Sequence, residues 1–392
     1  MTTTTAPAAT AATAAPARQE TPLTVTLEYK ALSANLGIVA RLAANGSAVQ
    51  ALRGVLISAE PGAPYVTLAA TDMETSLTIP VAAEVTQPGQ TLLPGALLEQ
   101  IVKALPSGPV TLTSDGDGQV TISAKKARFD LRTLRIGDYP PLPSPGGQAT
   151  ASLPASTLLG LLKATSPAAS LDQTRPILTG IQVNVTDTAI ETVATDSYRL
   201  AVAAEGVAND DGDIKPFSAL MPARALGLLE KISDPDASIA VELDGQRVMF
   251  CAGAATLTSR LISGQFPDWH QLVPQEFEFQ VRLPAATLRD TVQRIGLLAQ
   301  KNAPLVLAFD NGTLQVSAAT PDVGFAVETL EVAWQGEPLR LGLNHAYLST
   351  ALASLGGSEV IAHFVGPLRP ALLTNPDRPG DRHLLMPIRL SD

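Results

Sequence analysis

The amino-acid sequence predicts an α+β protein of three similar domains, each with two helices covering one face of an antiparallel sheet. A strand, a tight turn and a second strand recur around Asp72, Asp196 and Asp322, at intervals of 124 and 126 residues. Six stretches carry apolar residues at helical spacing, two in each third of the chain. The other apolar runs are short and alternate with polar residues, which is typical of strands.

Further features recur at almost the same interval, which indicates an internally repeated chain. Two of these repeated features are short motifs that open a helical stretch. The third is a segment in which an aromatic residue is followed by proline. They are Leu93-Pro94, Met221-Pro222 and Leu343-Asn344; Leu153-Pro154 and Leu283-Pro284; and Gly137-Asp138-Tyr139-Pro140 with Gly264-Gln265-Phe266-Pro267. The chain is therefore interpreted as three copies of one unit.

The elements follow the same order in each unit. Apolar residues at mostly helical spacing predict an amphipathic helix over residues 29–44. Strands are predicted at 54–58, 66–70 and 76–81, followed by a helix at 94–105 whose proline suits a first helical turn. A hairpin with its turn at 114–118 closes the unit. The later helices are predicted at 154–164, 222–232, 284–301 and 344–355.

Proline-rich segments separate the units. Residues 139–147 hold four prolines and two glycines, which continue neither a sheet nor a helix. The third unit begins after residues 267–274, so we expect domains at 22–148, 149–275 and 276–392. Residues 1–21 consist mostly of Thr, Ala and Pro, lack the apolar block of a secretory signal, and are predicted to be a disordered tail.

Composition excludes several classes of protein. No uninterrupted apolar run approaches the roughly 18 residues of a membrane span, so no membrane partner is expected. Cys251 is the only cysteine, which excludes an internal disulfide and favours a reducing, cytoplasmic setting. The four histidines, at positions 270, 345, 363 and 383, offer no zinc-ligand spacing with it. No metal or cofactor is predicted.

The charge distribution favours a nucleic-acid partner, although the formal net charge is −10. The six predicted helices carry nine cations against three anions, whereas the rest of the chain carries 18 cations and 34 anions. A local basic layer suits a DNA channel, because charges are screened within about 10 Å at moderate salt. The alternative is that Lys and Arg are simply good helix formers on solvated faces. The candidate channel residues are Lys30, Arg41, Lys103, Lys163, Arg224, Lys231, Arg289, Arg294 and Lys301.

The helices lack a cluster of Arg, Asn and Gln for reading base edges, so contact with double-stranded DNA should be with phosphate and independent of sequence. No nucleophile elbow, phosphate-binding loop or zinc-protease motif occurs in the sequence. The acidic turn at 209–213 lacks the later Glu of a calcium loop. Asp196 is either a general base or, as we favour, a turn residue that bonds its own backbone. Arg199 is either a phosphate ligand or, preferably, a structural ion-pair partner.

Three motifs resemble the bacterial sliding clamp, the DNA polymerase III beta subunit. They are Thr-Val-Ala-Thr-Asp followed after two residues by Arg-Leu-Ala-Val at 192–202, Leu-Met-Pro-Ile-Arg-Leu at 385–390, and Gly-x-Phe-Pro-Asp-aromatic at 264–269. The resemblance covers residues 23–390. It implies a head-to-tail homodimer that closes into a six-domain ring, with helices lining the hole and no catalysis.

The resemblance also implies a pocket for short partner peptides between the second and third domains. Its counterparts here are Leu178, Thr195, Ser197, Tyr198, Arg199, Leu200, Pro267, Leu272, Leu368, Pro370, Leu384, Met386, Pro387, Ile388, Arg389 and Leu390. The sequence departs from the family where Ser197-Tyr198 replaces Gly-His, where Gln271 replaces a basic residue, and where Ser391-Asp392 extend the terminus. A plain buried edge strand is the alternative interpretation of residues 384–390.

The implied function is processivity. The ring would tether the DNA polymerase III catalytic subunit, and the pocket would also take motifs from the clamp loader, other DNA polymerases and repair proteins. The alternative is a non-ring multidomain scaffold that binds peptides and no DNA. A hydrolase with an unrecognised site has no supporting constellation of residues.

Overall fold

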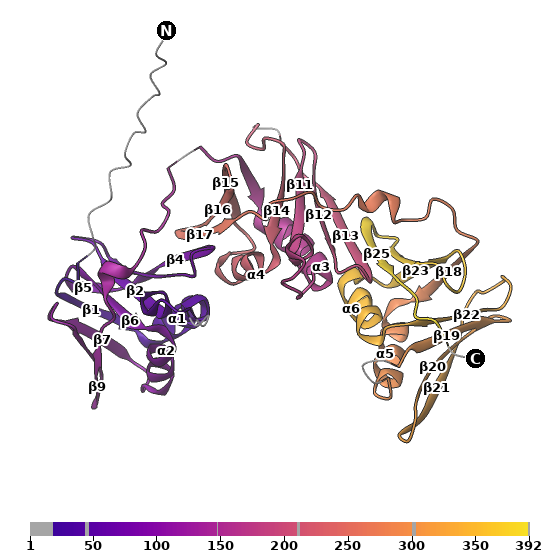
Figure 1. Ribbon diagram of the computed structural model, residues 1–392, viewed down its shortest axis with the longest axis horizontal. Helices are drawn as coiled ribbons and strands as arrows, with labels where there is room; N and C mark the ends of the chain where they lie inside the picture. The colour runs from indigo at the N-terminus through magenta and orange to yellow at the C-terminus, as the bar shows by residue number, and fades with distance from the viewer. Residues whose placement is uncertain (1–18, 44–46, 147, 210–211, 300–302, 391–392) are drawn as a thin grey trace, which may run out of the picture. The chain divides into compact units, whose positions relative to one another are not determined.

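The computed structural model describes residues 19–43, 47–146, 148–209, 212–299 and 303–390. Two compact units divide the chain: the first ends at residue 146 and also takes 254–258, and the second holds the remainder. The first unit contains the first domain and residues 254–258 of the second, and the second unit contains the rest of the other two domains. All six predicted helices are present (Figure 1), at α1 Tyr29–Ala43, α2 Gly95–Ala104, α3 Ala155–Thr165, α4 Ala223–Ile232, α5 Ala285–Gly296 and α6 His345–Leu355.

The first domain is an antiparallel α+β fold. Its strands are β1 Leu23–Glu28, β2 Gly54–Ala59, β3 Tyr65–Thr71, β4 Thr75–Ala82, β5 Glu84–Gln87, β6 Gly89–Pro94, β7 Pro109–Ser114, β8 Gln119–Ala124 and β9 Ala127–Arg132. They form a five-stranded sheet in the order β5-β1-β7-β8-β9 and a second run in the order β4-β3-β2-β6. Helix α1 packs on β3, β4 and α2. Its apolar stripe at positions 32, 36, 39, 40 and 42 is buried, as its spacing predicts.

The second domain repeats this order of elements. Its strands are β10 Ala151–Pro154, β11 Gly180–Val185, β12 Ala189–Thr195, β13 Arg199–Gly206, β14 Phe217–Pro222, β15 Ser238–Asp244, β16 Arg247–Ala252 and β17 Ala255–Arg260. Antiparallel pairing joins β14, β11, β12 and β13 in that order. Helix α3 packs on β12 and β13, and Trp269 of a short 3-10 helix at Trp269–Gln271 packs against Val193, Leu200 and Val202 of the same strands.

The third domain shares a sheet with the second. Its strands are β18 Phe279–Pro284, β19 Leu305–Asp310, β20 Thr313–Thr320, β21 Gly324–Glu331, β22 Leu339–Leu343, β23 Glu359–Phe364, β24 Ala371–Asn375 and β25 Arg378–Leu385. Strand β13 pairs with β25, which places Leu200 opposite Leu384. The sheet therefore continues β13-β25-β24-β23-β18, while β21-β20-β19-β22 form a separate sheet.

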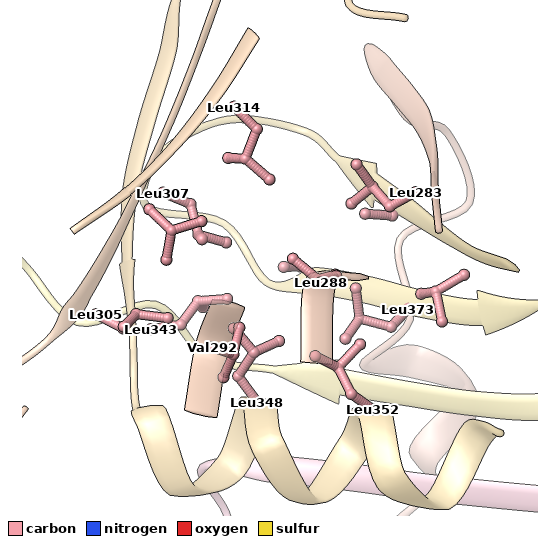
Figure 2. Packing of buried hydrophobic residues seen from close by; sticks show 14 of the residues in the cluster. Leu283, Leu288, Val292, Leu305, Leu307, Leu314, Leu343, Leu348, Leu352 and Leu373 are labelled. Atoms are coloured by element: carbon pink, nitrogen blue, oxygen red, sulfur yellow. The ribbon is translucent and has the colours of Figure 1, made fainter. Parts of the chain in front are cut away.

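Leucines from both helices and both sheets fill the core of the third domain. Figure 2 shows Leu348 and Leu352 of α6 directed towards Leu343 and Leu373 on the strands. These side chains are almost completely buried. Each buried leucine stabilises the fold by about 1.5–3 kcal/mol through loss of apolar surface from water. A single apolar core of this kind fixes α5 and α6 on the strands.

Two details of the predicted helices are wrong. Pro94, Pro154, Pro222 and Pro284 are not first-turn residues; each is the last residue of a strand and the N-cap of the next helix, with an extended ψ of 111–125°. Helix α5 ends at Gly296 instead of continuing to residue 301. The chain leaves the helix there through tighter turns, because the N–H groups of Leu298 and Ala299 donate to carbonyls three residues earlier.

The predicted tail at 1–21 is too long at its C-terminal end. The Glu20 carboxylate accepts hydrogen bonds from the hydroxyls of Thr91, Ser114 and Thr133, at 2.7, 3.3 and 2.8 Å. Thr21 forms an antiparallel bridge with Gln90. These residues therefore belong to the first domain, and the rest of the predicted tail, residues 1–18, lies outside the described residues. Asp210 and Asp211 of the acidic turn also lie outside them. None of the described helices is both long and apolar enough to cross a membrane.

Candidate functional site

The turn between β12 and β13 is built by Thr195 and Asp196. Asp196 Oδ1 accepts the N–H groups of Tyr198 and Arg199 at 2.9 and 3.0 Å. The Thr195 hydroxyl donates to the Arg199 carbonyl at 2.6 Å and accepts the Ser197 N–H at 3.2 Å. Ser197 takes a left-handed φ of 78°. Asp196 is thus committed to its own backbone, as expected of an aspartate in a tight turn.

The first domain repeats this turn bond for bond. The Thr71 hydroxyl donates to the Thr75 carbonyl and accepts the Met73 N–H, while Asp72 Oδ1 accepts the N–H groups of Glu74 and Thr75. Met73 has a φ of 77°. The third copy, at Asp322, keeps the position but not these bonds, because the Thr320 hydroxyl donates to the Leu298 carbonyl after α5. The repeat predicted from sequence is therefore exact in two domains and relaxed in the third.

Arg199 is held from two sides. Its Nε lies 3.0 Å from Asp196 Oδ2, and both side chains are largely buried. Its guanidinium also lies over the ring of Tyr347 on α6, 4.3 Å from the ring centre, which is a cation–π contact between the two domains. Burial, followed by the nearby charge of Asp196, raises the pKa of the Tyr347 hydroxyl. The structural role favoured for Arg199 is confirmed, and the same side chain also faces a hollow.

That hollow lies where β13 and β25 meet, and its volume is about 590 Å³. Leu200 and Leu384, opposite each other in the sheet, are buried at 2 % and 4 % exposure and form its apolar floor. Leu272, Leu368 and Met386 stand at its rim with 47 %, 58 % and 43 % of their surface exposed. Exposed apolar side chains gathered around a concave site are typical of a surface that binds a partner. We call this site the β13–β25 hollow.

The residues lining the β13–β25 hollow come from several segments. One is the turn and start of β13, another is the end of β25 with the residue that follows it, and the loops at 271–276 and 365–370 together supply the rest. The complete lining is Thr195, Ser197, Arg199, Leu200, Gln271, Leu272, Pro274, Glu276, Val365, Leu368, Arg369, Pro370, Leu384 and Met386. All of them belong to the second compact unit, so this unit alone shapes the site.

Most of the helix cations predicted for a DNA channel are exposed. Lys30, Arg41, Lys103, Lys163, Arg224, Lys231 and Arg294 are exposed, Arg289 is half-buried, and Lys301 lies outside the described residues. Among the described cations, Lys103 and Arg294 form ion pairs within the chain. Lys103 Nζ lies 2.7 Å from Glu99, and Arg294 contacts Glu328 through both Nε and a terminal nitrogen, at 3.0 and 2.6 Å. Arg294 is therefore largely used to hold β21 against α5.

Comparison with known proteins accounts for nearly the whole chain. Family models for the N-terminal, central and C-terminal domains of the DNA polymerase III beta subunit match residues 23–143, 152–268 and 270–389. The beta sliding clamp of Caulobacter vibrioides is 31 % identical over 377 residues, covering 93 % of this chain and all of the relative.

This chain belongs to the beta sliding clamp family. The clamp of Synechococcus elongatus is 32 % identical over 368 residues, covering 92 % of this chain and 97 % of its own. The solved clamp of Caulobacter crescentus superposes with a TM-score of 0.86 at 29 % identity, covering 95 % and 100 % of the two chains. The clamp of Pseudomonas aeruginosa bound to griselimycin has a TM-score of 0.84 at 26 % identity, covering 94 % and 100 %. The resemblance inferred from three short motifs is confirmed.

Nine of the sixteen pocket residues implied by the beta sliding clamp resemblance line the β13–β25 hollow. Leu178, Tyr198, Pro267, Pro387, Ile388, Arg389 and Leu390 do not line it. Tyr198 is 60 % exposed on the turn beside it, and Pro267 lines a separate hollow with Phe266. Leu178 is half-buried in a short 3-10 helix at Pro176–Thr179.

The end of this beta sliding clamp chain turns away from the hollow. The Met386 N–H donates to the Tyr198 carbonyl at 2.9 Å, which keeps this residue at the rim. Two residues later the Ile388 N–H donates to the Gly342 carbonyl at 2.8 Å, so the chain runs beside β22. The sequence left two interpretations of residues 384–390, a pocket and a buried edge strand. The structure divides this segment between the rim of the hollow and the edge of β22.

Five lining residues were absent from the sequence prediction: Gln271, Pro274, Glu276, Val365 and Arg369. Three of them flank Leu272, so their position in the same loop was the available signal. Val365 and Arg369 flank Leu368 in the other loop. No sequence pattern specifies which side chains of an irregular loop point inward, because loops lack the fixed periods of helices and strands.

Proposed function

We propose that this chain is a ring-shaped homodimeric sliding clamp that encircles duplex DNA without sequence specificity and tethers the replicative polymerase. The observation that carries this function is the match of all three beta-subunit domains, in order, to the three domains of the fold. The proposed activity is mechanical. It requires a closed ring and a partner-binding surface, and no residue is assigned a catalytic role.

Two unpaired strand edges support ring closure. Among the described strands, β9 lies at one edge of the five-stranded sheet of the first domain. Strand β21 lies at one edge of the four-stranded sheet of the third domain. Each edge carries exposed aromatic surface, with Phe129 at 37 % and Phe325 at 64 % exposure. Open edges with apolar side chains are templates for pairing with another chain. Pairing β9 of one chain with β21 of the other, twice, closes a dimer and leaves neither edge free.

The charges on these two edges are complementary. Strand β9 carries Arg128 and Arg132 around Asp130 on one face; on β21, Glu328 is paired with Arg294 on one face and Glu331 lies on the other. Opposite charges on neighbouring strands stabilise the pair by a few tenths of a kcal/mol to about 1 kcal/mol, and like charges oppose it. The Arg294 contact lowers the pKa of Glu328, which keeps this carboxylate ionised. The pattern favours the mixed β9–β21 pairing over pairing of either edge with itself.

The DNA contact is assigned to the exposed helix cations. The first domain supplies Lys30 on α1, and the second domain supplies Lys163 on α3 and Lys231 on α4. Both domains therefore contribute cations to the DNA contact. Such contacts neutralise phosphates and release counterions, which gives weak binding with a strong dependence on salt. The net charge of −10 keeps the remaining surface unattractive to DNA. Retention then depends on topology more than on affinity.

The β13–β25 hollow is proposed as the pocket for partner peptides. The structure of the Pseudomonas aeruginosa relative was solved with griselimycin bound. The occupants proposed here are short apolar motifs of the DNA polymerase III catalytic subunit, the clamp loader, other DNA polymerases and repair proteins. These partners and the DNA place the protein in the cytoplasm, at the nucleoid.

Retention on DNA tests the proposal. Chains are assembled on a closed circular duplex at high concentration, separated from free protein by gel filtration, and then challenged by cutting the circle. We expect protein to stay on the circle and to leave once the DNA is linear. The control is the same DNA cut before assembly. Equal retention on circular and linear DNA contradicts encirclement, and no retention on either favours the non-ring peptide scaffold.

A further inference from the structure

A second hollow lies between α3 and α6, on the helical side of the second compact unit. It has a volume of about 570 Å³, and no residue in it belongs to the β13–β25 hollow. The two helices contact each other, with α3 packed on β12 and β13 and α6 on β24 and β25, as Figure 1 shows. The seam is therefore fixed by the shared sheet beneath both helices.

The chemistry of this hollow is cationic and rich in hydroxyl groups. Lys163 of α3 and Arg378 at the start of β25 line it, together with Ser349, Thr350 and Ser354 of α6. No Asp or Glu is among its lining residues. Small residues such as Gly160 on α3 leave the space open. The Thr350 hydroxyl donates to the Ala346 carbonyl of its own helix at 2.6 Å. Two cations with the neighbouring hydroxyls of Ser349 and Ser354 around a concave surface match the oxygens of a phosphate group.

Arg378 is held in place by a buried carboxylate. Its Nε lies 3.0 Å from Asp381 Oδ2, and the Asp381 side chain is 1 % exposed while the Arg378 side chain is 42 % exposed. The guanidinium therefore has one edge fixed by the protein and another available to solvent. A buried carboxylate is costly unless it is paired, so it ties the arginine to this position. Fixing an arginine in advance reduces the entropy lost when it binds an oxyanion.

We propose that the α3–α6 hollow is a seat for one phosphate of the duplex backbone, gripped by Lys163 and Arg378. This assignment rests on the proposed encirclement of DNA and adds Arg378, which lies outside the helices, to the contacts. It also gives Asp381 a positioning role, because this residue acts only through Arg378. The hydroxyl groups of α6 supply contacts that are independent of base sequence.

Salt-dependent binding to a short linear duplex tests the seat. The logarithm of the binding constant falls with the logarithm of salt concentration by about 0.9 for each phosphate neutralised in duplex DNA. We expect Lys163→Gln and Arg378→Gln each to make this slope shallower, and removal of both cations to lower it by about 0.9, because the two cations share one phosphate. Arg378→Lys should retain most of the slope. The matched control is Arg247→Gln, an exposed arginine at the start of β16 that removes the same charge elsewhere.

Arg378→Gln leaves Asp381 buried without its partner, so the double variant Arg378→Gln/Asp381→Asn is measured beside it. This variant removes both charges and should bind DNA like Arg378→Gln. The seat is wrong if Lys163→Gln and the double variant keep the slope of the parent.

Retention on closed circular DNA separates this proposal from the proposed function. If Lys163→Gln and the double variant stay on circular DNA and their binding constant depends on salt as steeply as that of the parent, only the phosphate seat is refuted. Loss of retention in the parent chain overturns encirclement, and the seat with it.

Discussion

Truncating the rim of the β13–β25 hollow should weaken a partner peptide without affecting the ring. Leu272 and Met386 are 47 % and 43 % exposed, so about half of each side chain remains to be buried by a ligand. Full burial of such a side chain stabilises by about 1.5–3 kcal/mol, which leaves about 0.7–1.5 kcal/mol for each. The double variant Leu272→Ala/Met386→Ala should therefore lose about 1.5–3 kcal/mol of binding free energy, or roughly 10- to 150-fold in Kd.

Titration calorimetry with a short polymerase-derived peptide measures this loss. The matched control is Leu297→Ala, since Leu297 is 85 % exposed after α5 and does not line the hollow. Retention of both variants on circular DNA should equal that of the parent. A folded double variant with unchanged peptide affinity would refute the pocket, because the apolar contact would then lie elsewhere.

Two further perturbations test other parts of the structure. His383 is 5 % exposed, and burial, followed by the charge of Arg199, lowers its pKa to about 4. Because the unfolded histidine binds a proton at about pH 6.5, His383 should cost about 2 kcal/mol of stability between pH 7.5 and 5. Urea unfolding at both pH values should show a smaller loss for His383→Gln, and an equal loss would contradict this burial. Phe325→Asp places a charge on the β21 edge and should shift the protein from dimer to monomer in light scattering, whereas Tyr198→Asp, an exposed aromatic residue away from both edges, should not. If Phe325→Asp remains a dimer, the dimer interface does not include the β21 edge.

Local order and repetition made the fold predictable from sequence. The apolar stripe of α1 and the turn at Asp196 depend on residues close in the chain, and both are present as predicted. A threefold repeat then extends each correct local prediction to the other copies. The turn at Asp322 shows the limit of this reasoning, because Thr320 there bonds α5 instead of its own turn.

The helix ends depended on contacts that the sequence does not reveal. Proline is compatible with both an N-cap and a first helical turn, and the strand preceding each helix selected the N-cap. Glu20 appeared to belong to a polar tail. Its three hydroxyl partners lie 71 to 113 residues away in the chain, so only the folded sheet brings them together.

Local spacing and composition were enough to predict the three α+β domains, the six helices, the basic character of those helices and the motifs of the beta sliding clamp family. Folding brings together residues that the sequence keeps apart: Leu200 lies opposite Leu384, Ile388 pairs with Gly342 of β22, and Arg294 pairs with Glu328. These neighbours are set by the pairing of distant strands, because a charge or a leucine in the sequence does not specify which partner the fold will bring to it.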